Sequence, residues 1–461
     1  MFRNLLLILA AAAMHGSAPA STASLKPCYL AGFSERVECG SVSVPEDRAR
    51  PDGRKLTIHF ARIPALSRPA APDPVLVLAG GPGQGAMDYS PLLNSTLREA
   101  RKRRDILLVD QRGTGRSAPL NCKMPADAMA GGDADAQVQA ALRECVSKLD
   151  ADTRHYHLDA ALPDFEAIRQ QLGYRQLNLW GVSYGTRTAL VYARTYPGSV
   201  RSMVLDSVAP TNYNVLLSSA NVQAALDKLL ADCAADRACA TTYPALADDM
   251  KRLLAMPASG KLQRETVALV IRAALYSPRY ASVLPHAIHS AANGKPQPLQ
   301  GLADATMAWT DNSMSMGLTL SVLCAEEAPF AVPAALQADG RGSFLGDTFG
   351  RHWRSWCEAW PHGSANAGYR APVSSNIPTL LFAGGLDPVT PPATAELAAR
   401  TLGRSRVLVA QKAGHSFTGE GCAPRLTGAF LEHADPRAID GACLSSIRRP
   451  PFVLSSGSPT L

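Results

Sequence analysis

Several sequence patterns that define common classes of protein are missing from this chain. No C-x-x-C pair occurs, and no cluster of cysteine and histidine has zinc-finger spacing, which argues against a structural metal site. No G-x-x-x-x-G-K-[ST] loop is present, so the glycine-rich stretches do not predict a P-loop that binds phosphate. Apolar residues (46%) and charged residues (18%) occur in ordinary proportions, and there is no internal repeat, which excludes disordered and fibrous classes.

Long apolar runs and dense charge are also scarce. Beyond the N-terminus no apolar run reaches the length of a transmembrane helix, so we expect no membrane span. The formal net charge of +7 is small for 461 residues, and the densest basic run, Arg101 to Arg104, has no interleaved aromatic residues. Nucleic-acid surfaces often carry such aromatics, so we interpret this run as a solvated edge and expect no nucleic-acid partner.

The first 20 residues have the pattern of a secretory signal peptide. A start that contains Arg3 precedes an apolar core from Leu5 to Met14, and small residues follow at Ala18 to Ala20. We therefore expect a soluble, exported protein, either periplasmic or secreted.

The ten cysteines fit such a compartment, because disulfides persist where the environment is oxidising. Their number is even and they fall into neighbours along the chain, although sequence alone cannot fix connectivity. The expected local bridges are Cys28 with Cys39, Cys122 with Cys145, Cys233 with Cys239, Cys324 with Cys357, and Cys422 with Cys443.

Short apolar runs alternate with helical patterns along most of the chain, as is typical of parallel strands buried by helices on both faces. Between 210 and 370 this rhythm is lost and the pattern is mostly helical. The sequence therefore predicts an α/β fold in which 21–209 and 371–461 build a mostly parallel sheet and 210–370 forms an inserted cap. The expected strands are 75–78, 106–109, 177–180, 204–205, 380–383 and 407–410, with helices such as 162–172 and 394–402.

Ser183 lies in a G-x-S-x-G stretch, Gly181 to Gly185, between a strand-like run and a helical pattern. A serine on a sharp strand-to-helix turn is typical of a nucleophile elbow, in which the hydroxyl projects from the sheet edge. The alternative is an ordinary turn in which the serine caps the helix.

An acyl-transfer serine needs a base and a residue that orients the base, which follow it in the order acid, then histidine. Asp387 follows the strand 380–383, and His415 follows the strand 407–410, so both would emerge at the carboxyl edge of the sheet. Of the ten histidines only His415 has this setting, and we predict a triad of Ser183, Asp387 and His415.

Two backbone N–H groups are expected to form the oxyanion hole. One belongs to Tyr184, the residue after the nucleophile, and the other to the glycine-rich loop that follows the strand 75–78. Because Pro82 has no N–H, we assign the second donor to Gly81.

These motifs together resemble the proline iminopeptidase and tripeptidyl aminopeptidase family of α/β-hydrolases. The resemblance rests on Gly80 to Gly83, Asp110 to Ser117, the Ser183 elbow, Gly385 to Thr390 and Gly414 to Ser416. It implies an α/β-hydrolase fold, no cofactor, and cleavage of single residues or short peptides from free N-termini.

A cationic substrate amine is best bound by a carboxylate, which the cap would supply, and the candidates are Glu326 and Glu327, soon after Cys324. The resemblance favours Glu326 of the two. A solvated helix face is the alternative for this acid. We therefore expect a serine aminopeptidase. A carboxylesterase with the same triad and a non-catalytic binding protein are the alternatives, and the substrates would be peptides or small esters.

Overall fold

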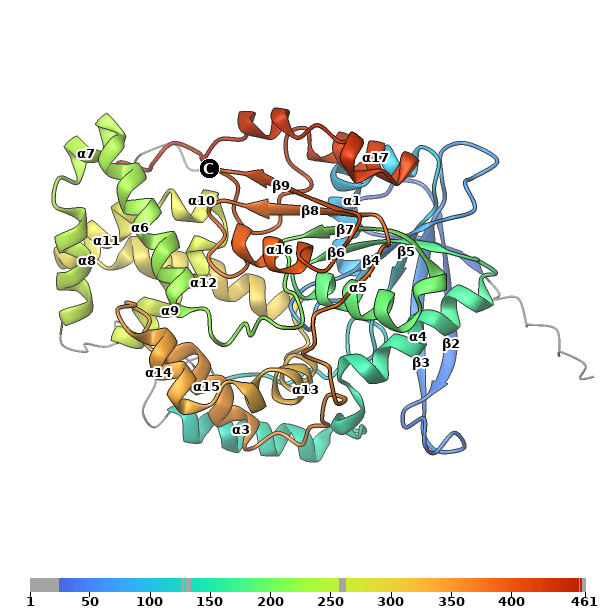
Figure 1. The fold of residues 1–461 in the computed structure, drawn as a ribbon. Coiled ribbons are helices and arrows are strands. Elements are labelled where there is room, and N and C mark those ends of the chain that lie inside the picture. The colour runs from blue at the N-terminus through green and yellow to red at the C-terminus, as the bar shows by residue number, and fades with distance from the viewer. Residues whose placement is uncertain (1–24, 126–127, 129–133, 257–262, 456, 458–461) are drawn as a thin grey trace, which may run out of the picture.

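The computed structural model describes residues 25–125, 128, 134–256, 263–455 and 457, so the predicted signal peptide lies outside the described residues. A nine-stranded sheet crosses the molecule in the order β1-β2-β3-β5-β4-β6-β7-β8-β9 (Figure 1). From β5 through β4 to β9 the neighbouring strands are parallel, whereas β1, β2 and β3 are antiparallel. The strands are β1 (Lys26–Cys28), β2 (Val37–Pro45), β3 (Lys55–Ile63), β4 (Val75–Leu78), β5 (Ile106–Val109), β6 (Leu177–Val182), β7 (Val200–Asp206), β8 (Thr379–Gly384) and β9 (Ser405–Ala410).

All six strands expected from the sequence are present, and β7 is longer than expected. Their side chains alternate between two apolar layers: in β4, Leu76 and Leu78 face one layer, and Val75 and Val77 face the other. Burial on both faces explains the unbroken apolar runs of these strands. The antiparallel strands β1 to β3 were not predicted, because β1 has only three residues and the side chains of β2 and β3 alternate in burial and give a weaker pattern.

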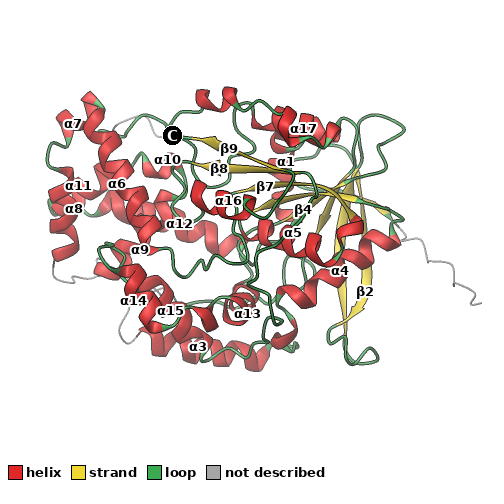
Figure 2. Cartoon of the chain, viewed as in Figure 1, coloured by secondary structure: helices red, strands yellow, loops and turns green. Residues whose placement is uncertain are grey.

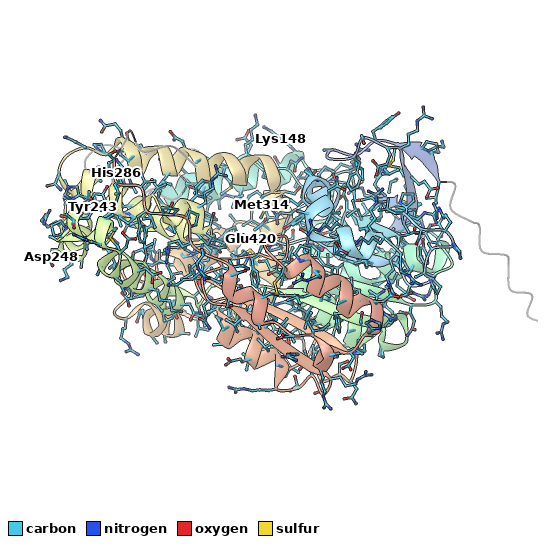
Figure 3. The ribbon with its side chains drawn as sticks, turned by 90° about the horizontal axis from the view of Figure 1, so that it is seen from above. Lys148, Tyr243, Asp248, His286, Met314 and Glu420 are labelled. Atoms are coloured by element: carbon cyan, nitrogen blue, oxygen red, sulfur yellow. A yellow bond between two sulfur atoms is a disulfide. The ribbon has the colours of Figure 1, made fainter. Side chains whose placement is uncertain are left out.

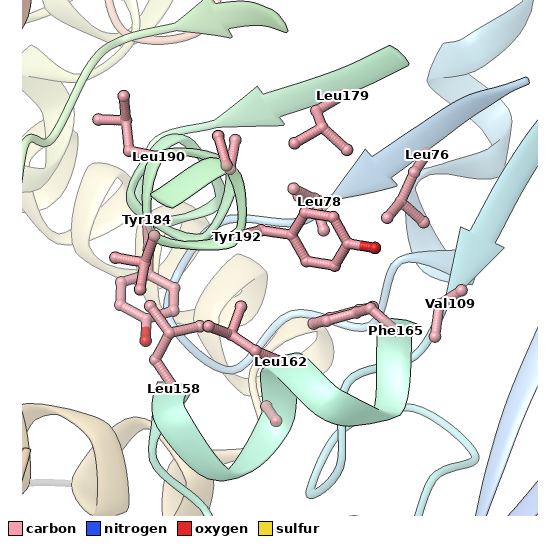
Figure 4. Close-up of a cluster of buried hydrophobic side chains, with 14 of the residues drawn as sticks. Leu76, Leu78, Val109, Leu158, Leu162, Phe165, Leu179, Tyr184, Leu190 and Tyr192 are labelled. Atoms are coloured by element: carbon pink, nitrogen blue, oxygen red, sulfur yellow. The ribbon is translucent and has the colours of Figure 1, made fainter. Parts of the chain in front are cut away.

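Helices cover both faces of the sheet (Figure 1). One layer is built with α4 (Leu158–Gln171), α5 (Tyr184–Thr195) and α16 (Pro392–Ala399), and Figure 4 shows Phe165 and Tyr192 against Leu76 and Leu179 within it. The other layer is built with α1 (Ser90–Thr96), α2 (Arg98–Arg101) and α17 (Ala423–His433).

The described part of 207–378 adds no strand to the sheet, and most of its helices lie beyond the carboxyl ends of β8 and β9 (Figure 2). The first seven of these helices share an apolar core of their own, which includes Leu229, Ile271 and Ile288. The helices are α6 (Ser219–Ala235), α7 (Arg237–Thr242), α8 (Leu246–Ala255), α9 (Arg264–Leu275), α10 (Pro278–Ala281), α11 (Leu284–Ala292), α12 (Gln297–Ser313), α13 (Met316–Glu326), α14 (Pro333–Gly340) and α15 (Thr348–Cys357).

We call the helices of 207–378 the helical layer, and one helix from outside this segment also belongs to it. α3 (Ala134–Lys148) precedes the nucleophile strand, yet it packs against α15, and His352 and Trp356 of α15 both bond to Asp135 of α3. Residues of α3, α13 and α15 share one apolar cluster. The helical layer is therefore assembled from two separate stretches of the chain.

Five disulfides are present, with the pairing expected from the sequence, and the described residues contain no free cysteine. Such bridges indicate an oxidising, extracellular environment. Among the described helices none is by itself long and apolar enough to cross a membrane, although one sharply bent pair, Met316–Phe330 with Pro333–Gly340, passes on length and composition.

Candidate active site

Ser183 occupies a strained turn between β6 and α5. Its backbone has φ +55° and ψ −122°, a conformation that non-glycine residues rarely adopt and that is costly unless the surroundings enforce it. The turn leaves no room for a side chain at Gly185, where a Cβ would lie 2.0 Å from the carbonyl oxygen of Leu78. The Ser183 hydroxyl makes no capping hydrogen bond to α5, which favours the nucleophile elbow over a helix cap.

Asp387 and His415 lie together at the carboxyl ends of β8 and β9. His415 Nδ1 is 2.8 Å from Asp387 Oδ2, and the carboxylate also accepts hydrogen bonds from the Val389 and Thr390 N–H groups, both 2.9 Å away. The Thr390 hydroxyl donates to the same Oδ2 at 2.7 Å. A fully buried carboxylate with this many donors is well suited to orient an imidazole.

The two groups shift each other's proton affinity. Burial opposes the charge of Asp387, but the nearby His415 charge and the hydrogen bonds outweigh it, so the pKa of this carboxyl lies below its usual value. Burial also disfavours the imidazolium of His415. The charge of Asp387 and the hydrogen bond to it outweigh that effect, so the pKa of His415 is raised.

The loop that carries His415 is held from the core side by β7. The Ser416 N–H donates to Ser207 Oγ at 2.8 Å, and the Thr418 N–H and hydroxyl donate to Asp206 Oδ2 at 2.9 and 2.6 Å. The Asp206 carbonyl accepts the N–H of Ser183 at 2.9 Å. Asp206 thus connects the nucleophile turn to the base loop.

The helical layer holds the other side of the same loop. The N–H of His415 donates to the carbonyl of Tyr276 at 2.9 Å, and the rings of these two residues stand edge to face with centroids 5.0 Å apart. Tyr276 follows α9 directly. Groups from the sheet and from the helical layer therefore fix the position of His415 together.

The glycine loop after β4 lies against the Ser183 turn, since a Cβ at Gly80 would be 3.2 Å from Ser183 Cβ. Gly81 has φ +105°, which favours glycine, and Tyr184 opens α5. The side chain of Met314 lies against Gly81, and Figure 3 labels it near the middle of the view. The oxyanion role of the Gly81 and Tyr184 N–H groups stays a prediction.

Glu326 ends α13 and is fully buried. Its carboxylate accepts hydrogen bonds from the N–H of Leu158 at 2.8 Å, from the hydroxyl of Tyr184 at 3.1 Å and from the hydroxyl of Tyr369. Burial raises the pKa of Glu326 to about 7, against the lowering effect of these donors. The amine-binding role stays a prediction, and three internal donors already occupy this carboxylate.

The sequence did not single out Thr390 or Asp206. Asp206 could have been predicted from the sequence, because it is an acid at the carboxyl end of an apolar strand. Asp387 was predicted from a similar position, a few residues after its strand. Thr390 had only its place three residues after the acid. No group of three or more His, Cys, Asp or Glu side chains within the described residues could hold a metal ion.

Comparison with known proteins gives relatives among peptidases. A tripeptidyl aminopeptidase of Streptomyces coelicolor is 32% identical over 203 residues, which cover 40% of this chain and 38% of the relative. Serine protease Hip1 of Mycobacterium tuberculosis is 25% identical over 451 residues, 85% of this chain and 84% of the relative. A proline iminopeptidase of Aeromonas sobria is 31% identical over 178 residues, 36% of each chain.

The chain spans about two fifths of the length of the tripeptidyl aminopeptidases that it matches. A family profile described as the alpha/beta hydrolase fold matches residues 73–421, from just before β4 to beyond the His415 loop. The predicted resemblance is confirmed by these findings, and the chain belongs to the α/β-hydrolase fold family.

Proposed function

We propose that this protein is an exported serine hydrolase that acts as an aminopeptidase, releasing single residues or short peptides from free N-termini. Residues 1–20 serve as its signal peptide, and residues 210–370 form a cap over the site. The proposal draws on the names of the relatives and on the five disulfides, which suit an exported protein.

The reaction proceeds through an acyl-enzyme. Ser183 attacks the scissile carbonyl while His415 accepts its proton, and His415 then delivers that proton to the leaving amine. Asp387 keeps the imidazole in the productive tautomer and stabilises the imidazolium. The N–H groups of Gly81 and Tyr184 bind the oxyanion, and water hydrolyses the acyl-enzyme by the same proton transfers in reverse.

One observation carries this proposal: the 2.8 Å hydrogen bond between His415 and Asp387 at the sheet edge that also bears the strained Ser183 turn. An imidazole paired with a buried carboxylate, after a serine on such a turn, supports acyl transfer rather than ligand binding alone.

A carboxylesterase is the second candidate, and the burial of Glu326 is the observation that favours it. A peptide amine needs a carboxylate to bind it, whereas a neutral ester does not. Four chromogenic substrates separate the two functions: an aminoacyl p-nitroanilide, a tripeptidyl p-nitroanilide, its N-acetylated form, and p-nitrophenyl butyrate. An aminopeptidase hydrolyses one or both free-amine anilides and not the acetylated one, whereas an esterase hydrolyses only the butyrate.

Ser183→Ala tests the nucleophile itself. We expect kcat to fall by several orders of magnitude, on the scale of the roughly millionfold loss seen when the subtilisin serine is removed. Ser199→Ala, in the turn between α5 and β7, is the matched control and should retain full activity. If Ser183→Ala keeps even a tenth of the wild-type rate on every substrate, the nucleophile lies elsewhere.

A further inference from the structure

The helical layer brings a cation close to the catalytic base. Arg272 of α9 donates from Nη2 to the Tyr276 hydroxyl at 3.0 Å, and the Tyr276 ring packs against the His415 ring. The positive charge of Arg272 acts on His415 and opposes its protonation. Arg272 and His415 therefore flank the same tyrosine.

Arg272 is partly buried and has no acidic partner, unlike the buried arginines Arg112 and Arg187. Arg112 is paired with Asp164, and Arg187 with Glu327. Among the described residues no carboxylate lies within ion-pair distance of Arg272, and its Nε is buried without a hydrogen-bond partner. A partly buried guanidinium with no carboxylate beside it and an unsatisfied buried Nε is incompletely compensated for the water it has lost, so its accessible N–H groups are suited to bind an anion from outside.

Two aromatic rings hold the guanidinium in place. Its central carbon lies 3.8 Å from the ring centroid of Phe349 on α15 and 5.3 Å from that of Tyr276. Stacking of this kind offsets part of the desolvation cost and restricts the side chain. The unbonded N–H groups of the planar fork are thus ordered before any ligand arrives, which favours binding of a carboxylate.

We propose that Arg272 binds a carboxylate on the leaving group of the substrate, so that the preferred substrates are short peptides whose departing part carries a free C-terminal carboxylate. The inference rests on the proposed function, because it is His415 that protonates the leaving amine. Because the leaving amine must approach His415 to be protonated, this inference places Arg272 on the leaving-group side of the scissile bond. An acidic side chain on the departing residue offers the same chemistry.

Matched peptides test this inference. One tripeptidyl sequence is followed by alanine with a free carboxylate, by alanine carboxamide, or by aspartate carboxamide, and kcat/KM is measured by chromatography of the released amine. The wild type should prefer the free acid to alanine carboxamide by about tenfold or more, mainly through KM. Aspartate carboxamide reports whether an acidic side chain can replace the terminal carboxylate.

Arg272→Gln should abolish the preference for the free acid, and Arg272→Lys should retain part of it. Arg279→Gln, an exposed arginine on α10, is the control and should keep the full preference. If the wild type hydrolyses the acid and the amide equally, or if Arg272→Gln slows both by the same factor, the inference is wrong and Arg272 only packs the helical layer.

Failure of the proposed peptidase function gives a different result. If no peptide is cleaved but short esters are, the same question is put with acetoxyacetate and acetoxyacetamide, whose leaving alcohols differ only in the carboxylate. A preference for acetoxyacetate that is lost in Arg272→Gln then supports the inference without peptidase activity. Equal rates on the two esters overturn it.

Discussion

Two fully buried carboxylates near the centre of this protein show how surroundings set the charge of a residue. Asp387 lies beside His415 and accepts four hydrogen bonds, which keep its pKa below the ordinary value despite burial. Glu326 has neutral donors around it, and burial prevails, raising its pKa to about 7. The first residue is suited to constant charge, and the second titrates near neutral pH.

The raised pKa of His415 predicts the acid limb of the pH–rate profile. The base must be neutral, so kcat/KM should fall as pH drops through the pKa of His415, which lies above its ordinary value of 6.5. The profile should be measured from pH 4 to 9 on a neutral ester, whose own charge does not change. Arg272→Gln should move the limb to higher pH, and a wild-type limb below pH 6 would contradict the assignment.

Glu326 predicts a pH dependence of stability. Its pKa of about 7 in the folded state exceeds the ordinary 4.5, so its contribution is full below pH 4.5 and is lost as pH rises through 7. The loss is on the order of 3 kcal/mol. Gln does not titrate. The free energy of unfolding of Glu326→Gln, measured with urea, should therefore rise by that amount relative to the wild type between pH 4.5 and 8. Glu358→Gln, at an exposed site, should show no such gain.

At the scale of elements, much of the sheet could be predicted from the sequence. Strands buried on both faces, such as β5 and β8, have unbroken apolar runs, so their positions were confirmed almost to the residue. The candidate triad could also be predicted, because strand ends determine where Asp387 and His415 emerge. The surroundings of Glu326 could not, since Leu158, Tyr184 and Tyr369 come from three distant segments that only the fold brings together.

The connection between β7 and the His415 loop gives a prediction at this scale. Asp206→Ala removes the acceptor for both Thr418 donors, and a misplaced imidazole should lower kcat roughly ten- to a hundredfold. Asp206→Asn keeps an acceptor but removes the charge, so it should retain more activity while the acid limb of kcat/KM moves to lower pH. Identical kinetics for both variants and the wild type would show that the loop needs no support from β7.

At the scale of the whole molecule, the disulfides differ in the length of the loop between their two cysteines. Cys324–Cys357 spans 33 residues and joins α13 to α15, whereas Cys233–Cys239 spans only 6. Loop-closure entropy gives about 3.7 kcal/mol for the longer span and about 2.2 kcal/mol for the shorter one.

The double variant Cys324→Ser with Cys357→Ser should therefore lose more stability than Cys233→Ser with Cys239→Ser, as measured by urea unfolding. Thiol labelling of the denatured, unreduced wild type should detect almost no free cysteine. Extensive labelling would contradict the five bridges, and the opposite order of stability loss would contradict the entropic explanation.

The helical layer is also bonded to both loops of the candidate triad. Tyr276 binds the N–H of His415, Tyr213 donates to the carbonyl of Val389, and Lys228 of α6 donates to the carbonyl of Gly385. A layer that swung aside to admit a substrate would have to break these bonds and release the acid and base loops together. The protein could then not admit a substrate and catalyse the reaction at the same time. A substrate narrow enough to enter without that movement is therefore converted faster. Loose chain ends meet this condition and folded domains do not.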